Sequence, residues 1–346
     1  MQKIPLRIPR GWRNLPEKRS QAHVIPNPIP EGTVTTKNRL CAAFALLATL
    51  LVSTASRAEI FRAYLASDGN DSHPCTLPQP CRLLPAALAA VASGGEIWLL
   101  DSANYNAATV TIGKSVTILA VPGAVGSVVA VGGPALSITA AGLVVALRNL
   151  VVVPLAGAGG TIGVSLTGAS TVVIEDSVFA NLPDKAVHVI GDGMTRIANA
   201  TFRNNYHSVF AEDGATVDIA ASRFSRNFTG ALAQSNIADK YTRVTVSDSV
   251  FAIQNHGFSA TAFNATAAAT VYAIRCSLTH MTEYAMLVWA ATPGSQAIIS
   301  IGSSMIANNN YSWFKSGMTG TIASFGDNQF ISNATSYGTL SQVSLN

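Results

Sequence analysis

The sequence predicts an all-β protein folded as a single-stranded parallel β-helix, a solenoid of about nine to ten turns of 22–28 residues. The first observation is a pattern that recurs between Val172 and Phe330. An apolar residue, β-branched in five of seven repeats, is followed after three positions by a small or polar residue and after five positions by Phe or another large apolar residue. The positions equivalent to Phe are Phe179, Phe202, Phe224, Phe251, Leu278, Ile306 and Phe330. Their spacing of 22 to 28 residues is typical of stacked repeats, each of which buries its apolar side against the next.

The second observation is the period of the apolar residues within each repeat. At 243–246, for example, Arg and Thr alternate with two Val residues. This period of two residues favours short β-strands over helices. A repeat of about 25 residues holds three such strands and three turns, and stacking at about 4.8 Å places equivalent residues in columns.

Two polar columns support this arrangement. The first contains small residues, which suit a tight corner that points inward: Ser177, Ala200, Ser222, Ser249, Cys276, Ser304 and Asn328. The second contains Asn at four positions: Asn205, Asn227, Asn309 and Asn333. Asn suits a turn because it tolerates the left-handed conformation and its amide can form hydrogen bonds along the stack.

The N-terminal part of the chain predicts export. Residues 39–58 read as a signal peptide, with a basic start, an apolar run at 40–52 and small residues around Arg57. A retained membrane anchor is the alternative, but the apolar stretch of 16 residues at 40–55 is shorter than the roughly 20 that a membrane span needs. We interpret residues 1–38 as an extension upstream of the true translation start, for which Val34 is a candidate.

The charge distribution argues against a nucleic-acid partner. Residues 1–58 contain nine Lys and Arg but only two Asp and Glu, which leaves thirteen basic and sixteen acidic residues in 59–346. The formal net charge of +4 therefore belongs to the N-terminal part. We expect a mature protein without a transmembrane span, located in the periplasm, outside the cell or at its surface.

Residues 59–93 are predicted to form an N-terminal cap, followed by the solenoid at 94–346. An oxidising compartment favours a disulfide between Cys75 and Cys81, whereas a metal site has only His73 nearby as a further ligand. Residues 83–91 predict a helix, ended by two glycines at 94–95, that would cover the open end of the solenoid. Cys276 lies in the small-residue column, which favours a buried structural role over a nucleophile.

A resemblance to a known group rests on several segments together: Tyr-Leu-Ala-Ser-Asp-Gly-Asn-Asp at 64–71, the two cysteines, Gly-Gly-Glu-Ile-Trp-Leu-Leu-Asp at 94–101 and Leu-Arg-Asn-Leu at 147–150. These resemble bacterial exported right-handed parallel β-helix repeat proteins, a largely uncharacterised branch of the pectate-lyase-like superfamily. The resemblance covers about 64–346 and implies a right-handed solenoid. It also implies a polysaccharide or cell-surface glycan as partner.

The sequence does not support a familiar pectinolytic mechanism. The Asn-Thr-Asp, Asp-Asp, Gly-His-Gly and Arg-Ile-Lys motifs of polygalacturonases are absent, and Asn255-His256-Gly257 matches only in part. The Arg-x-Pro-x-x-Arg segment of pectate lyases and the Gly-x-x-Asp-Phe-Ile-Phe-Gly segment of pectin methylesterases are absent as well.

Polar and aromatic residues recur five positions after each Phe equivalent. This column contains Asp184, His207, Thr229, His256, Glu283 and Tyr311. A regular stack would bring His256 and Glu283 near hydrogen-bonding distance, so His207, His256 and Glu283 are candidate catalytic residues. The candidate binding residues are Arg226, His280, Tyr284, Tyr311 and Trp313. The competing interpretation is a row of solvated turn residues.

The sequence predicts no cofactor and no metal site. Acidic residues at Asp176, Asp248 and Asp327 are separated along their column by neutral or basic residues, whereas calcium needs several converging oxygens. Three functions stay open at this point. The first is binding of a polysaccharide or cell-surface glycan, the second is a polysaccharide lyase or hydrolase of non-pectinolytic type, and the third is a structural or adhesive surface protein.

Overall fold

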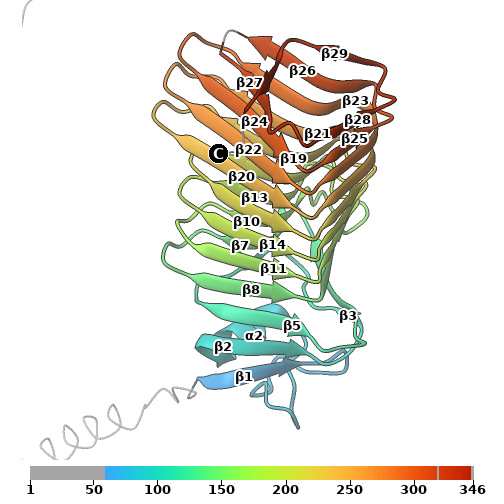
Figure 1. Ribbon diagram of the computed structural model, residues 1–346. Helices are drawn as coiled ribbons and strands as arrows, with labels where there is room; N and C mark the ends of the chain where they lie inside the picture. Colours follow the sequence, from blue (N-terminus) through green and yellow to red (C-terminus); the bar gives the residue numbers. More distant parts are fainter. Residues whose placement is uncertain (1–58, 318, 344–346) are drawn as a thin grey trace, which may run out of the picture. The chain divides into compact units, whose positions relative to one another are not determined.

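The computed structural model describes residues 59–317 and 319–343, and these form a column of parallel strands (Figure 1). The predicted extension at 1–38 and signal peptide at 39–58 lie outside the described residues, so both stay predictions. The strands stack in about ten turns, and each full turn contributes one strand to each of three faces. Every pairing between the named strands is parallel, which confirms the predicted parallel β-helix.

The first face is a sheet of twelve strands: β1 (Ile60–Leu65), β2 (Val91–Leu99), β5 (Val116–Ala120), β8 (Val144–Arg148), β11 (Thr171–Glu175), β14 (Met194–Ala198), β17 (Thr216–Ala220), β20 (Tyr241–Ser247), β22 (Ala268–Ile274), β24 (Gln296–Gly302), β27 (Thr321–Ser324) and β30 (Leu340–Gln342). The second face contains β3 (Ala103–Asn104), β6 (Gly126–Ala130), β9 (Leu150–Pro154), β12 (Val178–Ala180), β15 (Thr201–Arg203), β18 (Arg223–Ser225), β25 (Met305–Ala307) and β28 (Gln329–Ile331). The third face contains β4 (Val110–Thr111), β7 (Pro134–Ile138), β10 (Ile162–Leu166), β13 (Lys185–Ile190), β16 (His207–Glu212), β19 (Thr229–Ser235), β26 (Tyr311–Gly317) and β29 (Thr335–Tyr337). The long strands β21 (Val250–Ala262) and β23 (Ser277–Ala290) run through the second face into the third.

The core of the column is built from like residues in adjacent turns. Four phenylalanines of the second face are fully buried and stack with nearly parallel rings: Phe179, Phe202, Phe224 and Phe251. The distances between successive ring centroids are 5.1, 4.8 and 4.2 Å. The predicted Phe column is therefore the centre of the hydrophobic core.

The predicted Asn column forms a ladder of hydrogen bonds between turns. The Asn227 side chain accepts from the backbone N–H of Asn205 at 3.0 Å and donates to Gln254 Oε1 at 3.0 Å. The residues with positive φ are those one position earlier, such as Asn204 and Arg226. The hydrogen bonding predicted for the amides of this column is confirmed. The left-handed conformation predicted for the same residues is wrong, because it occurs at the residue before each of them.

The small-residue column has the same construction at the other corner of the second face. The hydroxyl of Ser222 donates to the carbonyl of Ala220 at 2.8 Å and accepts from the backbone N–H of Ala200. Cys276 is buried and its thiol donates to the Ile274 carbonyl at 3.3 Å, while burial raises the pKa of the thiol to about 11. Cys276 thus occupies the place of a serine, which confirms the structural interpretation.

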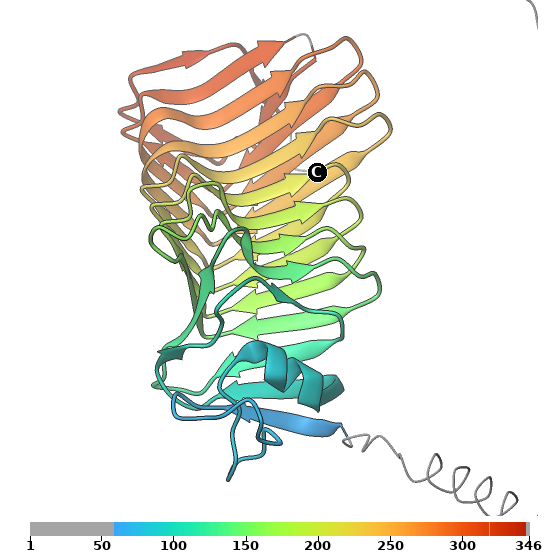
Figure 2. The ribbon, with the colours of Figure 1, turned by 180° about the vertical axis from the view of Figure 1, so that it is seen from behind.

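Helix α2 (Leu84–Ala90) lies at the N-terminal end of the column, beside β1 and β2 (Figure 2). Leu84, Ala87 and Leu88 are buried in the core. The two glycines predicted to end the helix instead lie inside β2, because the chain becomes extended directly at Val91. A side chain at Gly95 would meet the Phe61 carbonyl at 2.3 Å, so the register shift between β1 and β2 requires glycine there.

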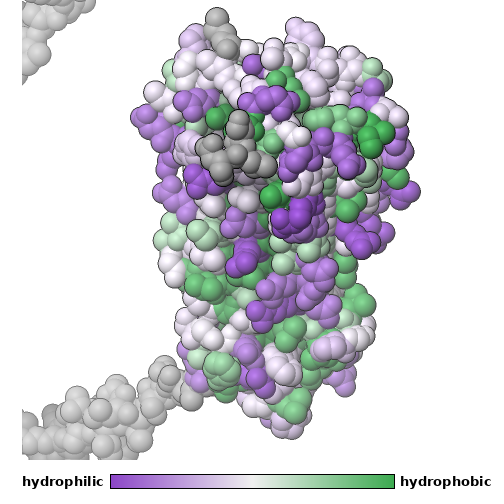
Figure 3. Space-filling view, in the orientation of Figure 1, coloured by the Kyte–Doolittle hydropathy of each residue, from purple (hydrophilic) through white to green (hydrophobic). Residues whose placement is uncertain are grey.

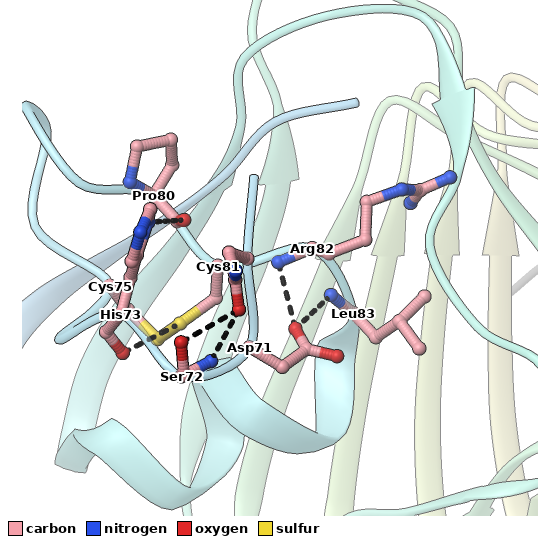
Figure 4. The surroundings of a disulfide bond; sticks show 9 residues. Asp71, Ser72, His73, Cys75, Pro80, Cys81, Arg82 and Leu83 are labelled. Atoms are coloured by element: carbon pink, nitrogen blue, oxygen red, sulfur yellow. Dashed lines mark hydrogen bonds between the residues drawn. A yellow bond between two sulfur atoms is a disulfide. The ribbon is translucent and has the colours of Figure 1, made fainter. Parts of the chain in front are cut away.

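The predicted disulfide between Cys75 and Cys81 is present (Figure 4). Asp71 lies in the same loop, and its Oδ1 accepts hydrogen bonds from the backbone N–H groups of Arg82 and Leu83 at 2.8 Å each. This contact connects the loop to the residues that precede α2. A capping role for residues 59–93 stays a prediction, since β1 already belongs to the first face.

We predict that Asn227→Ala lowers the free energy of unfolding by about 2–3 kcal/mol, because it leaves buried donors and acceptors of the adjacent turns without partners. The exposed Asn310→Ala variant is the control and is expected to change stability by less than about 0.5 kcal/mol. Urea unfolding of both variants measures the difference. Equal losses would contradict a structural role for the ladder.

Candidate functional site

The outward side of the third face combines charged, polar and aromatic side chains. Val187 and Val189 of β13 lie in the core, so the alternating His188 and Ile190 face outward. Pairing between turns then defines three outward columns. The first contains Lys185, His207, Thr229, His256, Tyr284 and Tyr311. The second contains His188, Phe210, Leu232, Ser259, Leu287 and Phe314, and the third contains Ile190, Glu212, Gln234, Thr261 and Trp289.

The middle of the third face is sheltered although its side chains face outward. The exposed fraction is below 9% for His188, Phe210, Leu232, Ser259 and Thr261. On the outward side of the first face, by contrast, large residues are open to solvent: Met194, Tyr241, Tyr272 and Ile274. Figure 3 shows that face with hydrophilic residues interrupted by hydrophobic patches. Sheltered polar groups are typical of ligand sites, which makes the third face the candidate site.

His256 and Glu283 form a hydrogen bond of 2.9 Å between Nε2 and Oε2. Their predicted proximity is confirmed, but the predicted register is not. The pairing of β21 with β23 shifts between Gln254 and His256, so that Tyr284 lies opposite His256. Thr282 and Glu283 lie opposite the single residue Asn255 in this bulge, and the side chain of Glu283 is directed toward His256.

The environment of Glu283 favours the ionised carboxylate. The hydrogen bond from His256 holds the pKa of Glu283 below its ordinary value, and Asn255 adds a second donor at 3.2 Å. His256 is 8% exposed, whereas the side chain of Glu283 is 44% exposed. Glu283 is therefore the member of the pair that a ligand can reach, with His256 as its buried partner.

His207 lies on the same face but outside this pair. Thr229 separates it from His256 in the column, and the Phe228 ring lies at 6.1 Å from the His207 ring and 4.9 Å from the His256 ring. Burial, with Lys185 nearby, lowers the pKa of His207 to about 4. Its Nδ1 is buried and forms no hydrogen bond with the residues that the structure describes. The structure thus places His207 as a neutral ring among aromatic side chains.

The sequence analysis missed a second His–carboxylate pair on this face. His188 Nε2 lies 2.9 Å from Glu212 Oε2, and the other carboxylate oxygen accepts from Asn236 at 2.8 Å. The hydrogen bond from His188 lowers the pKa of Glu212. The strand pairing places His188 opposite Phe210 in the next turn. Glu212 lies two residues further along that strand, so the contact between His188 and Glu212 is diagonal. The two residues of a diagonal pair belong to different columns. Comparing residues within one column therefore does not reveal the pair, whereas comparing residues of adjacent columns would.

A row of rings runs along the column next to these pairs, and we call it the aromatic ladder. Its members are Tyr206, Phe228, His256, Tyr284, Tyr311, Phe314 and Tyr337. Neighbouring ring centroids are 4.6 to 5.3 Å apart, with Tyr284 contacting both Tyr311 and Phe314, and the last two are 6.1 Å apart. Tyr206 and Phe228 are nearly parallel at 5°, but the rings around Tyr284 are tilted by 34° to 55°. Tilting exposes part of each ring face as well as the edge.

Of three further candidate binding residues, one is placed differently from the prediction. Arg226 and His280 have positive φ at the corner between the second and third faces, where both are exposed. Trp313 packs against the core and Phe330, and its indole N–H donates to the Gly338 carbonyl at 3.0 Å. The prediction that these three lie close to His256 therefore fails for Trp313, because the pairing of β23 with β26 directs it inward.

Within residues 59–317 and 319–343, no group of three or more His, Cys, Asp or Glu side chains is arranged to hold a metal ion. Asp248 instead forms an ion pair with Arg275, and Asp327 accepts hydrogen bonds from Ser303. In the same ranges, no helix is long and apolar enough to cross a membrane.

Comparison with known proteins agrees with the fold. Residues 155–298 match the family model described as "Right handed beta helix region". The chain is a right-handed parallel β-helix. The predicted resemblance to this class of proteins is confirmed for the fold. No curated protein matches the sequence.

Several solved structures are similar to this chain at low sequence identity. A GH136 lacto-N-biosidase from Eubacterium ramulus is 9% identical with a TM-score of 0.41, over 90% of this chain and 72% of that one. The pectate lyase Pel9A is 13% identical with a TM-score of 0.42, over 83% and 80%. The pectin methylesterase PemA from Erwinia chrysanthemi is 9% identical with a TM-score of 0.38, over 82% and 94%.

We predict that protonation of His207 destabilises the fold. Its folded-state pKa of about 4 is below the ordinary value of 6.5, so the unfolded chain binds the proton first. Its contribution to stability is present above about pH 6.5 and is lost as the pH falls toward 4. Urea unfolding between pH 4 and 8 should show a steeper acid loss for the parent protein than for His207→Gln. Parallel curves, or a His207 proton resonance that titrates near pH 6.5, would contradict the buried neutral ring.

Proposed function

We propose that this is an exported protein that binds a polysaccharide or cell-surface glycan along the outward side of the third face. The observation that carries the proposal is the aromatic ladder beside the two His–carboxylate pairs. Sugar rings have apolar faces that pack on aromatic side chains, and hydroxyls that need hydrogen-bond partners. Both requirements are met on one surface, by the rings around Tyr284 and by the polar groups of Glu212, Gln234 and Glu283.

The geometry favours a ligand that extends along the column. The ladder crosses the turns that contain β16, β19, β21, β23, β26 and β29. Six turns at about 4.8 Å per turn span roughly 24 Å between the first and the last. A chain molecule fits this length better than a single small sugar. The periplasm, the medium and the cell surface are the locations in which such polymers are met.

Substitution of the ladder tests the proposal. Phe228→Ala and Tyr284→Ala should each weaken glycan binding about tenfold, since an aromatic contact contributes about 0.5–1.5 kcal/mol beyond its buried area. Tyr272→Ala, on the open side of the first face, is the matched control and should bind like the parent. Calorimetric titration of the purified protein with a panel of neutral and acidic polysaccharides gives the affinities. Binding that survives both ladder variants, or is lost in the control, would place the ligand elsewhere.

Cleavage of the bound glycan is a second candidate function, supported by the hydrogen bond between His256 and Glu283. A carboxylate that stays ionised can accept a proton, which suits a general base in a lyase or hydrolase. If the pair is catalytic, Glu283→Gln should lower the release of new reducing ends or unsaturated products by about 100-fold or more. The Tyr272→Ala variant again serves as control. A parent protein that binds but releases no product would leave binding as the function.

A further inference from the structure

The charges of the third face indicate which class of glycan it accepts, an inference that rests on the proposed function. Glu212 and Glu283 both face outward, and each receives a hydrogen bond from a histidine at 2.9 Å. These hydrogen bonds lower the pKa of both carboxyl groups, so both are ionised at neutral pH. A ligand on this face therefore meets two negative charges, one in the turn of β16 and one in the turn of β23.

The cations around this face are mostly neutralised by their own neighbours. Lys185 lies 2.8 Å from Asp184, and Lys240, in the turn before β20, lies 3.0 Å from Asp192. The side chain of Glu212 is 20% exposed and that of Glu283 is 44% exposed, so water screens the charge of Glu212 less than that of Glu283.

The remaining ionisable groups add little positive charge to the sheltered part. His207 is neutral because burial lowers its pKa to about 4. The strand pairing places Lys315 opposite the inward-facing Val288, and the Lys315 side chain lies against Gly338. Arg226 and His280 are exposed at the corner, one column outside the rings.

A polymer of uronic acids would bring a carboxylate with every sugar to this surface. Like charges repel, and most strongly where water is excluded. A neutral sugar brings hydroxyls instead, which donate hydrogen bonds to ionised carboxylates, and such charge-assisted bonds are the stronger kind. We propose that the third face selects neutral, hydroxyl-rich polysaccharides and rejects polyuronates, with Glu212 and Glu283 as the selecting residues.

This selection also bears on the second candidate function. A lyase removes a proton from the carbon next to a carboxyl group, and a neutral polysaccharide has no such group. Selection of neutral glycans would therefore leave hydrolysis as the cleavage chemistry open to Glu283.

The test compares the two ligand classes on the same protein. The purified chain is titrated at pH 7.5 in 50 mM and 500 mM NaCl with a neutral mixed-linkage β-glucan, a mannan, polygalacturonate and alginate of similar chain length. We expect at least one neutral polymer to bind ten times more tightly than either polyuronate at low salt. The difference should narrow at high salt, because screening weakens the repulsion.

Variants identify the source of the selection. The double variant Glu212→Gln/Glu283→Gln should reduce the ratio of neutral to polyuronate affinity at least fivefold, whereas Asp218→Asn on the first face should leave it unchanged. Urea unfolding of each variant checks that the fold is kept. A polyuronate that binds through Phe228 and Tyr284 at least as tightly as any neutral polymer would overturn the selection but keep the proposed glycan face. If no polymer of either class binds, the proposed function itself fails.

Discussion

The parallel backbone pairing between successive turns is the constraint on which the rest of the structure depends. It fixes the turn-to-turn distance and places equivalent residues directly above one another. A residue in one turn must therefore be compatible with its copies in the turns on either side. Phenylalanines and asparagines satisfy this requirement in the core, because phenylalanine rings stack on one another and asparagine amides form hydrogen bonds with one another. The same constraint outside the core produces the aromatic ladder, so the ladder is partly a consequence of the fold.

This repetition explains how much of the fold was readable from sequence. The Phe column, the small-residue column and the amide ladder all follow from residues that recur at similar spacing, and the structure contains them. The glycines at 94–95 were misread as a helix end because a glycine in a strand and a glycine after a helix look the same locally. Only the close approach of the Phe61 carbonyl, a contact between distant residues, distinguishes the two cases.

The candidate site was predictable only where the repeat is regular. His256 and Glu283 were placed together by counting from the Phe column, yet their contact depends on a bulge that the count does not include. Trp313 was misplaced because counting gives a position along the strand but not the side of the strand. His188 and Glu212 were missed because their contact is diagonal. In each case the missing information is the exact pairing between turns, which sequence spacing alone does not determine.

The bulge at Glu283 shows how a repetitive fold acquires a site that is not repeated. In a regular stack, Glu283 would occupy one rung of a column and meet only its neighbours above and below. One extra residue in β23 between Met281 and Tyr284 shifts the pairing, so that Tyr284 lies opposite His256 and continues the row of rings. The carboxylate is then free to lie against His256 and remain half open to solvent. A single local irregularity thus joins an aromatic surface and a fixed charge, while the inward pairing of Phe251 with Leu278 stays in regular register.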